Sequence, residues 1–329
     1  MSALAPTLEA FFVERLLGQR RASQHTIAAY RDTFCLLLGF VKERTGVAPA
    51  ALRLEDLDAQ LVGAFLEHLE RDRHNCARTR NARLSAIHSF FRFAALRHPE
   101  HAGLITRVLA IQPKRFDRAV VTFLTDEEVT ALLAAPDQGR WLGRRDHALL
   151  LLAIQTGLRV SELTGLTEGD VMLGRGAHVR CLGKGRKERA TPLTATTAAV
   201  LRAWLDERRG EPGDPLFPTR QGAPLSRYAV TLLVSRHAQV ASGRCPSIAT
   251  KNVTPHVLRH TAAMRLLHAG VDTSVIALWL GHESSETTSM YVHADMTLKE
   301  RALARTGPIG GRPGRYRPGD QLLAFLESL

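Results

Sequence analysis

An imidazole and a guanidinium stand one helical turn apart in the stretch "TPHVLRHTAAMRLLHAG", residues 254–270. Thr254 is a favourable N-cap residue and Pro255 suits the first helical position, so a helix is expected to begin here. His256 and Arg259 are three residues apart and therefore share a face of that helix. Unpaired backbone N–H groups and the positive end of the helix dipole attract anions at this end. The stretch predicts an anion-binding position, although such a pair alone is more often an ordinary helix surface.

Further residues that can act on an anion stand in turns or at element ends elsewhere in the chain. Arg159 follows Gly157 in "TGLRVSEL", and Lys184 lies in the expected turn "GKGRKE". His282 follows a glycine in "LGHES", and Tyr291 lies nine residues later. The set suits phosphodiester cleavage, in which a tyrosine attacks phosphorus and cations hold the developing charge. A lysine or histidine would protonate the leaving oxygen.

The elements that would carry these residues follow from hydrophobic periodicity and capping signals. A capping box of Thr125 and Glu128 begins one helix. The glycine-containing turn "GKGRKE" separates two short strand patterns, which predicts an antiparallel hairpin. The predicted strands are His178–Leu182 and Ala190–Leu193, and the further predicted helices are Thr194–Arg209, Ser226–Ala241, Pro255–Ala269 and Ser274–Leu280. This part of the chain is expected to be mainly α with a small antiparallel sheet.

The first third of the chain has a helical pattern throughout, from Leu8 to about Ala110. Apolar residues recur there at spacings of three and four, as in helices packed on a core. The clearest stripes are Ile27, Tyr30, Phe34, Leu37, Leu38 and Val41, and Leu84, Ile87, Phe91 and Ala94. The arginines of this region are Arg71, Arg73, Arg78, Arg80, Arg83, Arg92 and Arg97. They indicate a solvated basic face of a helical bundle or, as the net charge favours, a face that rests on phosphates.

The domain organisation follows from breaks in these patterns. A proline and several charged residues in Ile111–Val121 predict a linker. The stretch "GPIGGRPGRYRPGD" is typical of a flexible or extended strap, and "QLLAFLESL" after it predicts a short helix that docks on its own or a neighbouring subunit. The expected parts are an N-terminal helical domain over 1–111, a linker over 112–118, a second domain over 119–305, and the strap and short helix over 306–329.

The charge balance points to a polyanionic partner. Lysine and arginine number 44 against 32 acidic residues, and the formal charge of +12 is spread along the 329 residues. The longest clean apolar run, Ala148–Ile154, is far shorter than the roughly 20 residues of a membrane span. The N-terminus lacks the basic region of a secretory signal. We therefore expect a soluble cytoplasmic protein.

Cofactor and metal motifs do not appear in the sequence. The four cysteines have neither zinc-ligand nor disulfide spacing, and they are expected to be reduced and mostly buried. P-loop, HExxH and GxGxxG motifs are absent. We expect neither a cofactor nor a metal.

Arg, Lys, His-x-x-Arg, His and Tyr occur in this order in "TGLRVSEL", "GKGRKER", "HVLRH", "LGHES" and "TTSMYVHAD". The ordered set resembles the signature of tyrosine recombinases of the phage integrase family. The pattern is similar to that of Xer-type recombinases and of integrases of mobile elements. The resemblance runs from about residue 8 to residue 305. Each motif is weak alone, but their joint match in order is highly specific.

The resemblance implies a role for each matching residue. Tyr291 would be the nucleophile that forms a 3′-phosphotyrosine and frees a 5′-hydroxyl. Arg159 and Arg259 would hold the nonbridging oxygens of the scissile phosphate, which the planar guanidinium suits. Glu162 would orient Arg159. The phosphotyrosine keeps the energy of the broken bond, so rejoining would need neither ATP nor a metal.

The remaining signature residues would move protons or bind the phosphate. Lys184 would protonate the leaving 5′ oxygen, although Lys187 in the same turn is an alternative for this amine. His256 would assist proton transfer around the attacking tyrosine, and His282 would hydrogen-bond the phosphate. His260, by contrast, is expected to be a satisfied helix residue of the core.

The resemblance also implies a fold and partners. An all-α, SAM-like core-binding domain would precede a mainly α catalytic domain, and the two would close around double-stranded DNA. Family members act as homo- or hetero-tetramers on inverted-repeat core sites and exchange a C-terminal segment. Partner recombinases or accessory proteins are also possible under this resemblance.

The expected function is integration, excision or transposition of a mobile element by a nucleoid-associated recombinase. Xer-type resolution of chromosome or plasmid dimers is the alternative. A non-catalytic DNA-binding protein is disfavoured because the signature is complete. An enzyme like type IB topoisomerases is disfavoured by the helical N-terminal domain and the Xer-like tyrosine segment.

Overall fold

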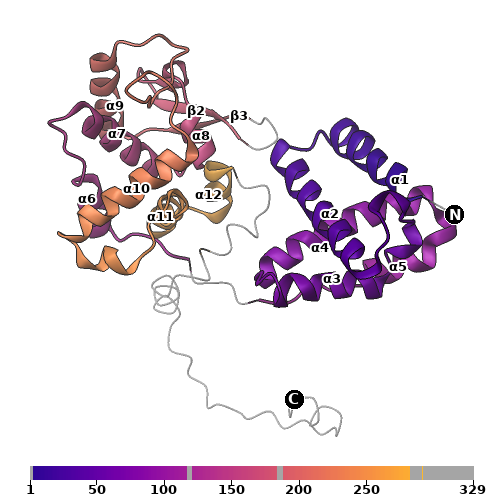
Figure 1. Ribbon diagram of the computed structural model, residues 1–329. Helices are drawn as coiled ribbons and strands as arrows, with labels where there is room; N and C mark the ends of the chain where they lie inside the picture. Colours follow the sequence, from indigo (N-terminus) through magenta and orange to yellow (C-terminus); the bar gives the residue numbers. More distant parts are fainter. Residues whose placement is uncertain (1–2, 117–120, 184–187, 282–290, 292–329) are drawn as a thin grey trace, which may run out of the picture. The chain divides into compact units, whose positions relative to one another are not determined.

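The computed structural model contains two compact units, Met1–Ala119 and Val120–Leu329, which are described separately (Figure 1). The residues whose structure is described are 3–116, 121–183, 188–281 and 291. Each unit has a hydrophobic core of its own. Both are mostly helical, and the second also contains a three-stranded sheet. The predicted fold class is confirmed.

The first unit is helical along its described residues. Its α-helices are α1 (Leu4–Ala10), α2 (Gln24–Thr45), α3 (Ala59–Arg71), α4 (Ala77–Arg97) and α5 (Ala102–Leu109). A π-helix, η1 (Phe11–Gln19), continues α1. Short 3₁₀ turns are η2 (Pro49–Ala51), η3 (Leu54–Asp56) and η4 (Pro99–His101). The predicted helical pattern over the first third of the chain is confirmed.

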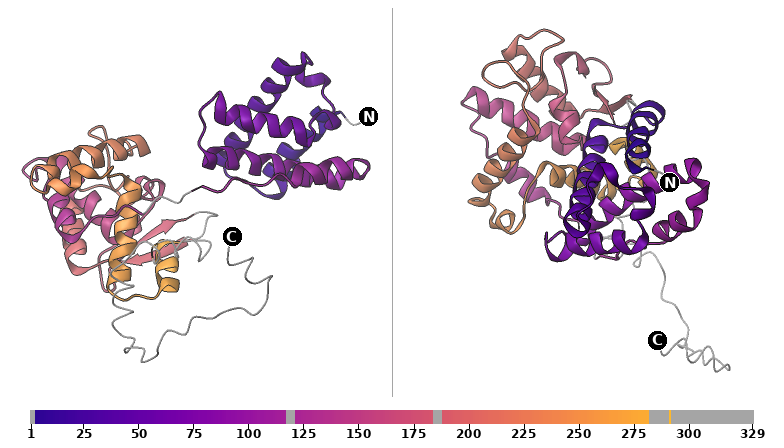
Figure 2. Two further views of the ribbon diagram at one scale, coloured as in Figure 1. Left: turned by 90° about the horizontal axis from the view of Figure 1, so that it is seen from below. Right: turned by 45° about the vertical axis from the view of Figure 1, so that its right-hand side comes forward.

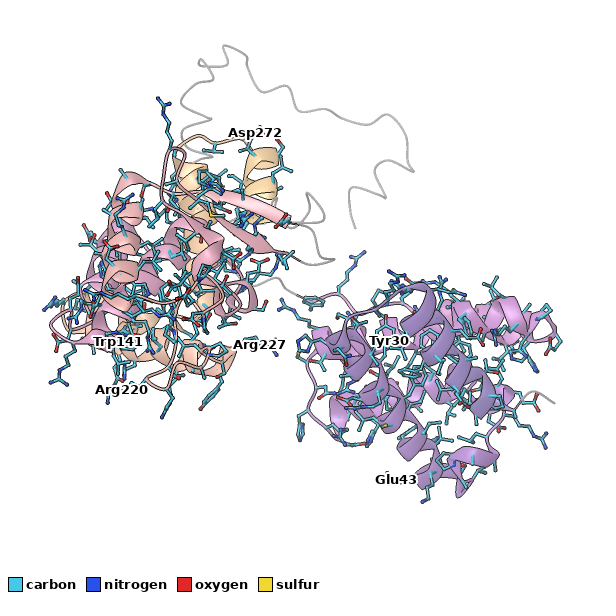
Figure 3. All side chains as sticks on the ribbon, turned by 90° about the horizontal axis from the view of Figure 1, so that it is seen from above. Tyr30, Glu43, Trp141, Arg220, Arg227 and Asp272 are labelled. Carbon is cyan, nitrogen blue, oxygen red and sulfur yellow. The ribbon has the colours of Figure 1, made fainter. Side chains whose placement is uncertain are left out.

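The two predicted apolar stripes supply much of the core of this unit. Phe34, Leu37 and Val41 of α2 are buried, and so is the whole predicted stripe of α4. Phe11 of η1 lies between them and meets the ring of Phe34 edge to face. Tyr30, labelled in Figure 3, is half-buried and stacks on Phe11 at the edge of the core. The stripe is therefore most deeply buried toward the C-terminal half of α2.

The arginine-rich helix α4 also anchors the chain that leaves this unit. Arg80 is only 7% exposed and donates to the carbonyl of Gln112 at 3.2 Å. Asn81 donates to the carbonyl of Lys114 at 2.7 Å, and the Lys114 ammonium pairs with Glu70 at 2.7 Å. The first half of the predicted linker thus runs along α4. The prediction that Arg80 belongs to a phosphate-binding face is wrong, because its guanidinium is buried against this segment.

The second unit contains the remaining helices and strands of the described chain (Figure 2). Its helices are α6 (Asp126–Leu133), α7 (Trp141–Thr156), α8 (Val160–Thr164), η5 (Glu168–Asp170), α9 (Ala195–Arg208), α10 (Arg227–Ser242), η7 (Pro246–Thr250), α11 (Pro255–His268) and α12 (Thr273–Leu280). Its strands are β1 (Val171–Met172), β2 (His178–Leu182) and β3 (Glu188–Pro192). The capping box of Thr125 and Glu128 is present at the start of α6, as predicted.

The strands form one antiparallel sheet in the order β1-β2-β3. His178 pairs with Pro192 and Leu182 with Glu188, so the predicted hairpin is confirmed. The turn between its strands, residues 184–187, lies outside the described residues. Strand β1 is missing from the predictions because two residues carry no readable alternation. The hairpin lies beside the end of α12 (Figures 1 and 2), where a β3 side chain reaches Gly281.

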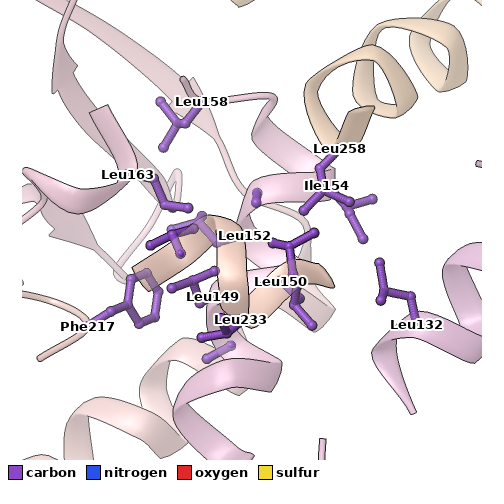
Figure 4. Close-up of a cluster of buried hydrophobic side chains, with 14 of the residues drawn as sticks. Leu132, Leu149, Leu150, Leu152, Ile154, Leu158, Leu163, Phe217, Leu233 and Leu258 are labelled. Carbon is purple, nitrogen blue, oxygen red and sulfur yellow. The ribbon is translucent and has the colours of Figure 1, made fainter. Parts of the chain in front are cut away.

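Helix α7 runs through the middle of the second core. Leu149, Leu150, Leu152 and Ile154 are buried among side chains of the surrounding helices (Figure 4). Every residue of α7 is at least partly buried, and its partly exposed positions form only a narrow outer face that includes Arg144, so its amphipathic pattern is weak. The predictions lack this helix for that reason. Within the described ranges, neither α7 nor another helix is both long and apolar enough to cross a membrane.

The cysteines differ from the prediction of mostly buried thiols. Cys35 and Cys76 are exposed, Cys245 is half-buried, and Cys181 of β2 is buried. Cys76 is the N-cap residue of α4 and Cys35 lies on the outer side of α2, positions that face solvent. Burial raises the pKa of the Cys181 thiol to about 11. This thiol is therefore protonated and unreactive at neutral pH.

Candidate active site

Two helix C-termini hold the two predicted phosphate-binding arginines. Arg259 of α11 is 4% exposed and donates to the carbonyls of Gly157 at 2.7 Å and Leu280 at 2.8 Å. Arg159, which directly precedes α8, donates to the carbonyl of Gly281 at 2.9 Å. These carbonyls lie at the ends of α7 and α12, where helix dipoles are negative. The structure thus brings together two guanidiniums from motifs that are far apart in the sequence.

The glycines of "TGLR" and "LGHE" are required by this arrangement. Gly157 and Gly281 end α7 and α12 in the left-handed conformation, with φ of 65° and 66°. A Cβ atom on Gly157 would lie 2.5 Å from Cδ2 of Leu280, and one on Gly281 would lie 2.8 Å from Nη1 of Arg189. Both positions therefore combine a backbone conformation that favours glycine with a close approach.

Glu162 of α8 orients Arg159, as predicted. Its carboxylate accepts from Nη1 of Arg159 at 2.8 Å and from the Arg159 backbone N–H at 2.7 Å. Arg189 of β3 forms two further bonds to it, at 3.0 and 2.9 Å. Burial acts to raise the pKa of Glu162, but the hydrogen bonds and charges of Arg189 and Arg159 outweigh it and hold that pKa below its usual value. Glu162 is therefore a carboxylate that fixes two arginines.

Arg189 is a site residue that the sequence analysis missed. It lies on the face of β3 that also carries the buried Thr191, and its side chain is largely covered. Residues two apart on a strand share a face, so an arginine two residues from a buried threonine is expected to point inward. This spacing is the sequence signal that could have identified Arg189. Its contact with Glu162 ties the hairpin to the active-site helices.

The charges of the two signature arginines act on each other. Burial, together with the neighbouring charge of Arg159, lowers the pKa of Arg259 to about 10, so the Arg259 guanidinium stays protonated at neutral pH. The side chain of Arg159 is 32% exposed, which leaves it accessible from solvent. Because like charges repel, an anion bound between them would be stabilised by both. Two guanidiniums held in this way are suited to binding an oxyanion.

His256 stands at the start of α11, where it was predicted. Thr254 caps this helix, and Pro255 occupies its first turn. The imidazole is exposed and contacts the ring of His260 edge to face, with 4.2 Å between centroids. Desolvation and the charges of Arg259 and Arg159 lower the pKa of His256. His256 is therefore mostly neutral at pH 7 and can accept or donate a hydrogen bond.

Tyr291 lies in the same region, buried to 2% exposure. Its ring packs in an apolar cluster with Val121, Ala263, Met264, Leu267, Ile276 and Leu280. Its hydroxyl oxygen lies 3.0 Å from Nδ1 of His260. Burial raises the pKa of Tyr291, while the charges of Arg259 and Arg159 oppose that rise. The phenol is therefore protonated at neutral pH, and a nucleophilic role requires a proton acceptor.

His260 is buried as predicted, but its partner is the tyrosine hydroxyl. It is 8% exposed and lies one turn after His256 on α11. Its spacing of four from His256 is the signal that could have placed it in the site.

Two signature residues fall outside the described part of the chain. Lys184 and its alternative Lys187 belong to the hairpin turn, and His282 follows directly after Gly281. The segment 306–329 also lies outside it. Within the residues that are described, no group of three or more His, Cys, Asp or Glu side chains could hold a metal ion.

Comparisons with known proteins agree with this fold. Residues 122–297 match the model of the phage integrase family, and residues 10–98 match that of the phage integrase N-terminal SAM-like domain. The chain is 56% identical over 329 residues to putative integrase/recombinase y4rC of Sinorhizobium fredii, covering 100% of this chain and 99% of that protein. It is 34% identical to tyrosine recombinase XerC of Pelobacter propionicus, covering 90% and 93%.

A solved structure has the same fold. The XerH site-specific recombinase in its post-cleavage complex with a palindromic difH substrate superposes with a TM-score of 0.66 at 23% identity. The match covers 87% of this chain and 81% of that one. The chain described here belongs to the phage integrase family. Within that family it is a tyrosine recombinase, an enzyme of site-specific DNA cleavage and rejoining.

Proposed function

We propose that Tyr291 attacks a DNA phosphate held by Arg159 and Arg259, giving a 3′-phosphotyrosine and a free 5′-hydroxyl. The observation that carries this proposal is the convergence of two fixed guanidiniums and a phenol in one unit. Both guanidiniums are positioned by carbonyls and by Glu162 before any phosphate binds. A site fixed in this way stabilises charge that develops on the phosphate without reorganising during the reaction.

The other signature residues complete the proposed reaction. Lys184 protonates the 5′ oxygen as it leaves, with Lys187 as the alternative amine, and His282 hydrogen-bonds the phosphate. These roles rest on the position of each residue in the ordered motifs. His256 stands at the positive end of α11, and its lowered pKa suits a neutral hydrogen-bonding group beside the phosphate.

The proposed substrate is double-stranded DNA with inverted-repeat core sites, bound by a tetramer of recombinase subunits. The formal charge of +12 supports a polyanionic partner. Residues 1–111 form the proposed core-binding domain, 112–118 its linker, 119–305 the catalytic domain and 306–329 a strap and helix for subunit contacts. The XerH relative was solved on its difH substrate, which supports DNA as the partner. We place the enzyme in the cytoplasm, on the nucleoid.

Movement of a mobile element is the biological role we favour. The y4rC protein, named an integrase/recombinase, matches this chain over its whole length, including residues 306–329. The XerC match covers 90% of the chain at lower identity. Xer-type dimer resolution is the second candidate because of that relationship. The two differ in substrate: an integrase acts on the ends of an element that carries its gene, and a resolvase acts on one chromosomal or plasmid site.

A suicide-substrate trap tests the proposed chemistry. DNA that flanks the gene is nicked near candidate inverted repeats and incubated with the wild-type protein or Tyr291→Phe, with a gel shift to verify binding. We expect a covalent protein–DNA band on a denaturing gel with the wild type alone. Binding by both proteins without a covalent band from the wild type would contradict the proposal.

A further inference from the structure

The hydroxyl that must lose its proton is already in contact with a base. Tyr291 Oη lies 3.0 Å from Nδ1 of His260, within hydrogen-bonding distance, and the two rings meet edge to face. His260 is 8% exposed, so the contact is shielded from solvent. The sequence motifs give the proton-transfer role to His256 and none to His260. The geometry gives His260 the more direct contact.

We propose that His260 accepts the proton of the Tyr291 hydroxyl during DNA cleavage and returns it during rejoining. This inference rests on the proposed function, because it assumes that Tyr291 is the nucleophile. It makes His260 a catalytic residue, since Nδ1 touches the reacting oxygen. His256 would then act on the phosphate side of α11.

Cleavage by this route moves two protons, one from the phenol and one to the leaving oxygen. The O–H bond of Tyr291 breaks as its electron pair forms the new bond between Oη and phosphorus, and the proton moves to Nδ1 of His260. The bond between phosphorus and the 5′ oxygen breaks, and that oxygen takes a proton from the Lys184 ammonium. Rejoining reverses both transfers. His260 must be neutral beforehand, with its own proton on Nε2.

The surrounding charges act on both partners of the transfer: they favour loss of the phenol proton, and they oppose a positive charge on the imidazole. The groups that act on the phenol are Arg259 and His260 of α11 and Arg159 before α8. His256 covers the imidazole of His260 from one turn earlier. The two guanidiniums stabilise a developing tyrosinate and disfavour a protonated imidazole nearby. Burial keeps the phenol neutral until a base takes its proton.

Two substitutions separate proton transfer from positioning. His260→Asn places an amide near Nδ1 that can accept a hydrogen bond but cannot take a proton at neutral pH. His260→Leu removes both abilities. We expect both to slow single-turnover cleavage of the nicked substrate by about 100-fold or more, as for loss of a general base. The matched control is His268→Asn, an exposed position on the same helix whose ring contacts Phe123.

The pH dependence distinguishes a base from a structural residue. Without a base, cleavage depends on the small fraction of tyrosinate, so the rate of His260→Asn should rise about tenfold per pH unit from pH 7 to 9. The wild-type rate should change little over this range. A variant slowed only by misfolding or misplacement would keep the wild-type profile. Gel shifts and thermal melts verify that each variant binds DNA and folds.

A substrate with sulfur in place of the bridging 5′ oxygen locates the proton. Sulfur leaves as a thiolate without protonation, so cleavage of this substrate no longer needs a general acid. A variant that lacks the acid should therefore regain its rate, whereas a variant that lacks the general base should not. We expect Lys184→Ala to recover most of its rate on it and His260→Asn to stay slow. Recovery of His260→Asn would overturn the proposal and move His260 to the leaving group. If His260→Asn cleaved the ordinary substrate as fast as the wild type, the proposal would also be overturned. If the wild type formed no adduct at Tyr291, the proposed function itself would be overturned.

Discussion

The arginines of the two units are held in different ways. In the N-terminal unit, Arg73 and Arg92 are exposed, and each can meet a phosphate by adjusting a flexible side chain. In the catalytic unit, Arg259 is 4% exposed and bonded to two backbone carbonyls before any ligand arrives. The first arrangement suits many weak, salt-sensitive contacts that do not depend on exact position. The second suits one phosphate whose charge changes during a reaction, because its donors are already in place.

The largest expected effect is the loss of Arg259. Arg259→Ala should reduce single-turnover formation of the covalent adduct by about 10³-fold, close to 4 kcal/mol of transition-state stabilisation. Arg259→Lys should recover little of this loss, because one ammonium group cannot replace a planar guanidinium that donates to the carbonyls of both Gly157 and Leu280. Binding to the same DNA, measured by gel shift, should weaken much less. Equal losses in binding and cleavage would show that Arg259 is an ordinary binding arginine.

The next largest effect is a loss of folding stability, and it differs between two glycines with the same backbone conformation. Gly157→Ala should destabilise the protein by about 2–4 kcal/mol, because a positive φ is combined with a Cβ position 2.5 Å from Leu280. Gly46→Ala, at the end of α2 with φ of 72° and open space around it, should cost about 1 kcal/mol. Denaturant unfolding of each variant measures both values. Similar losses would mean that the close packing around the active-site glycine contributes nothing.

Acid stability should depend on the carboxylate that joins Arg159 and Arg189. Folding lowers the pKa of Glu162, so its stabilising contribution is complete above the ordinary glutamate pKa of about 4.3 and is lost as pH falls through the lower folded-state value. Melting temperatures between pH 6 and pH 3 should therefore fall less steeply in Glu162→Gln than in the wild type. Glu43→Gln, at an exposed position of α2, is the control and should follow the wild type. Parallel curves for all three proteins would contradict this account of Glu162.

The smallest effect is expected for a single exposed arginine of the N-terminal unit. Arg92→Ala should weaken DNA binding several-fold and reduce the slope of log K against log salt by about 1. Single-turnover cleavage at saturating DNA should be unchanged. Arg31→Ala, which removes an exposed arginine paired with Asp32, serves as the comparison. A changed cleavage rate at saturation would mean that Arg92 acts on the chemistry and not only on binding.

Local patterns predicted much of this structure. The helix that begins at Thr254, the hairpin and the capping box of Thr125 each depend on residues close in the sequence, and each is present. The contact between Arg159 and Glu162 was predictable for the same reason, since three residues separate them. The apolar stripe of α4 followed from its spacing of three and four.

Contacts between distant segments could not be predicted in this way. Arg259 donates to carbonyls at the ends of α7 and α12. These two helix ends lie close together because both helices pack on α11. Helix α7 is at least partly buried along its whole length, so its polar stripe is too narrow to show a clear pattern. Arg189 lies on a five-residue strand with a single buried neighbour, and its partner Glu162 is on another element. The contact between His260 and Tyr291 could not be predicted, because the helical pattern does not show where Tyr291 lies relative to α11.

The measurement that tests the central claim most directly is identification of the amino acid bonded to DNA. The trapped adduct is digested with protease and nuclease, and the modified peptide is sequenced by mass spectrometry. The account predicts one nucleotide remnant on Tyr291, linked through a 3′-phosphate, with no such peptide from Tyr291→Phe. A remnant on another residue, or a linkage through the 5′-phosphate, would contradict it.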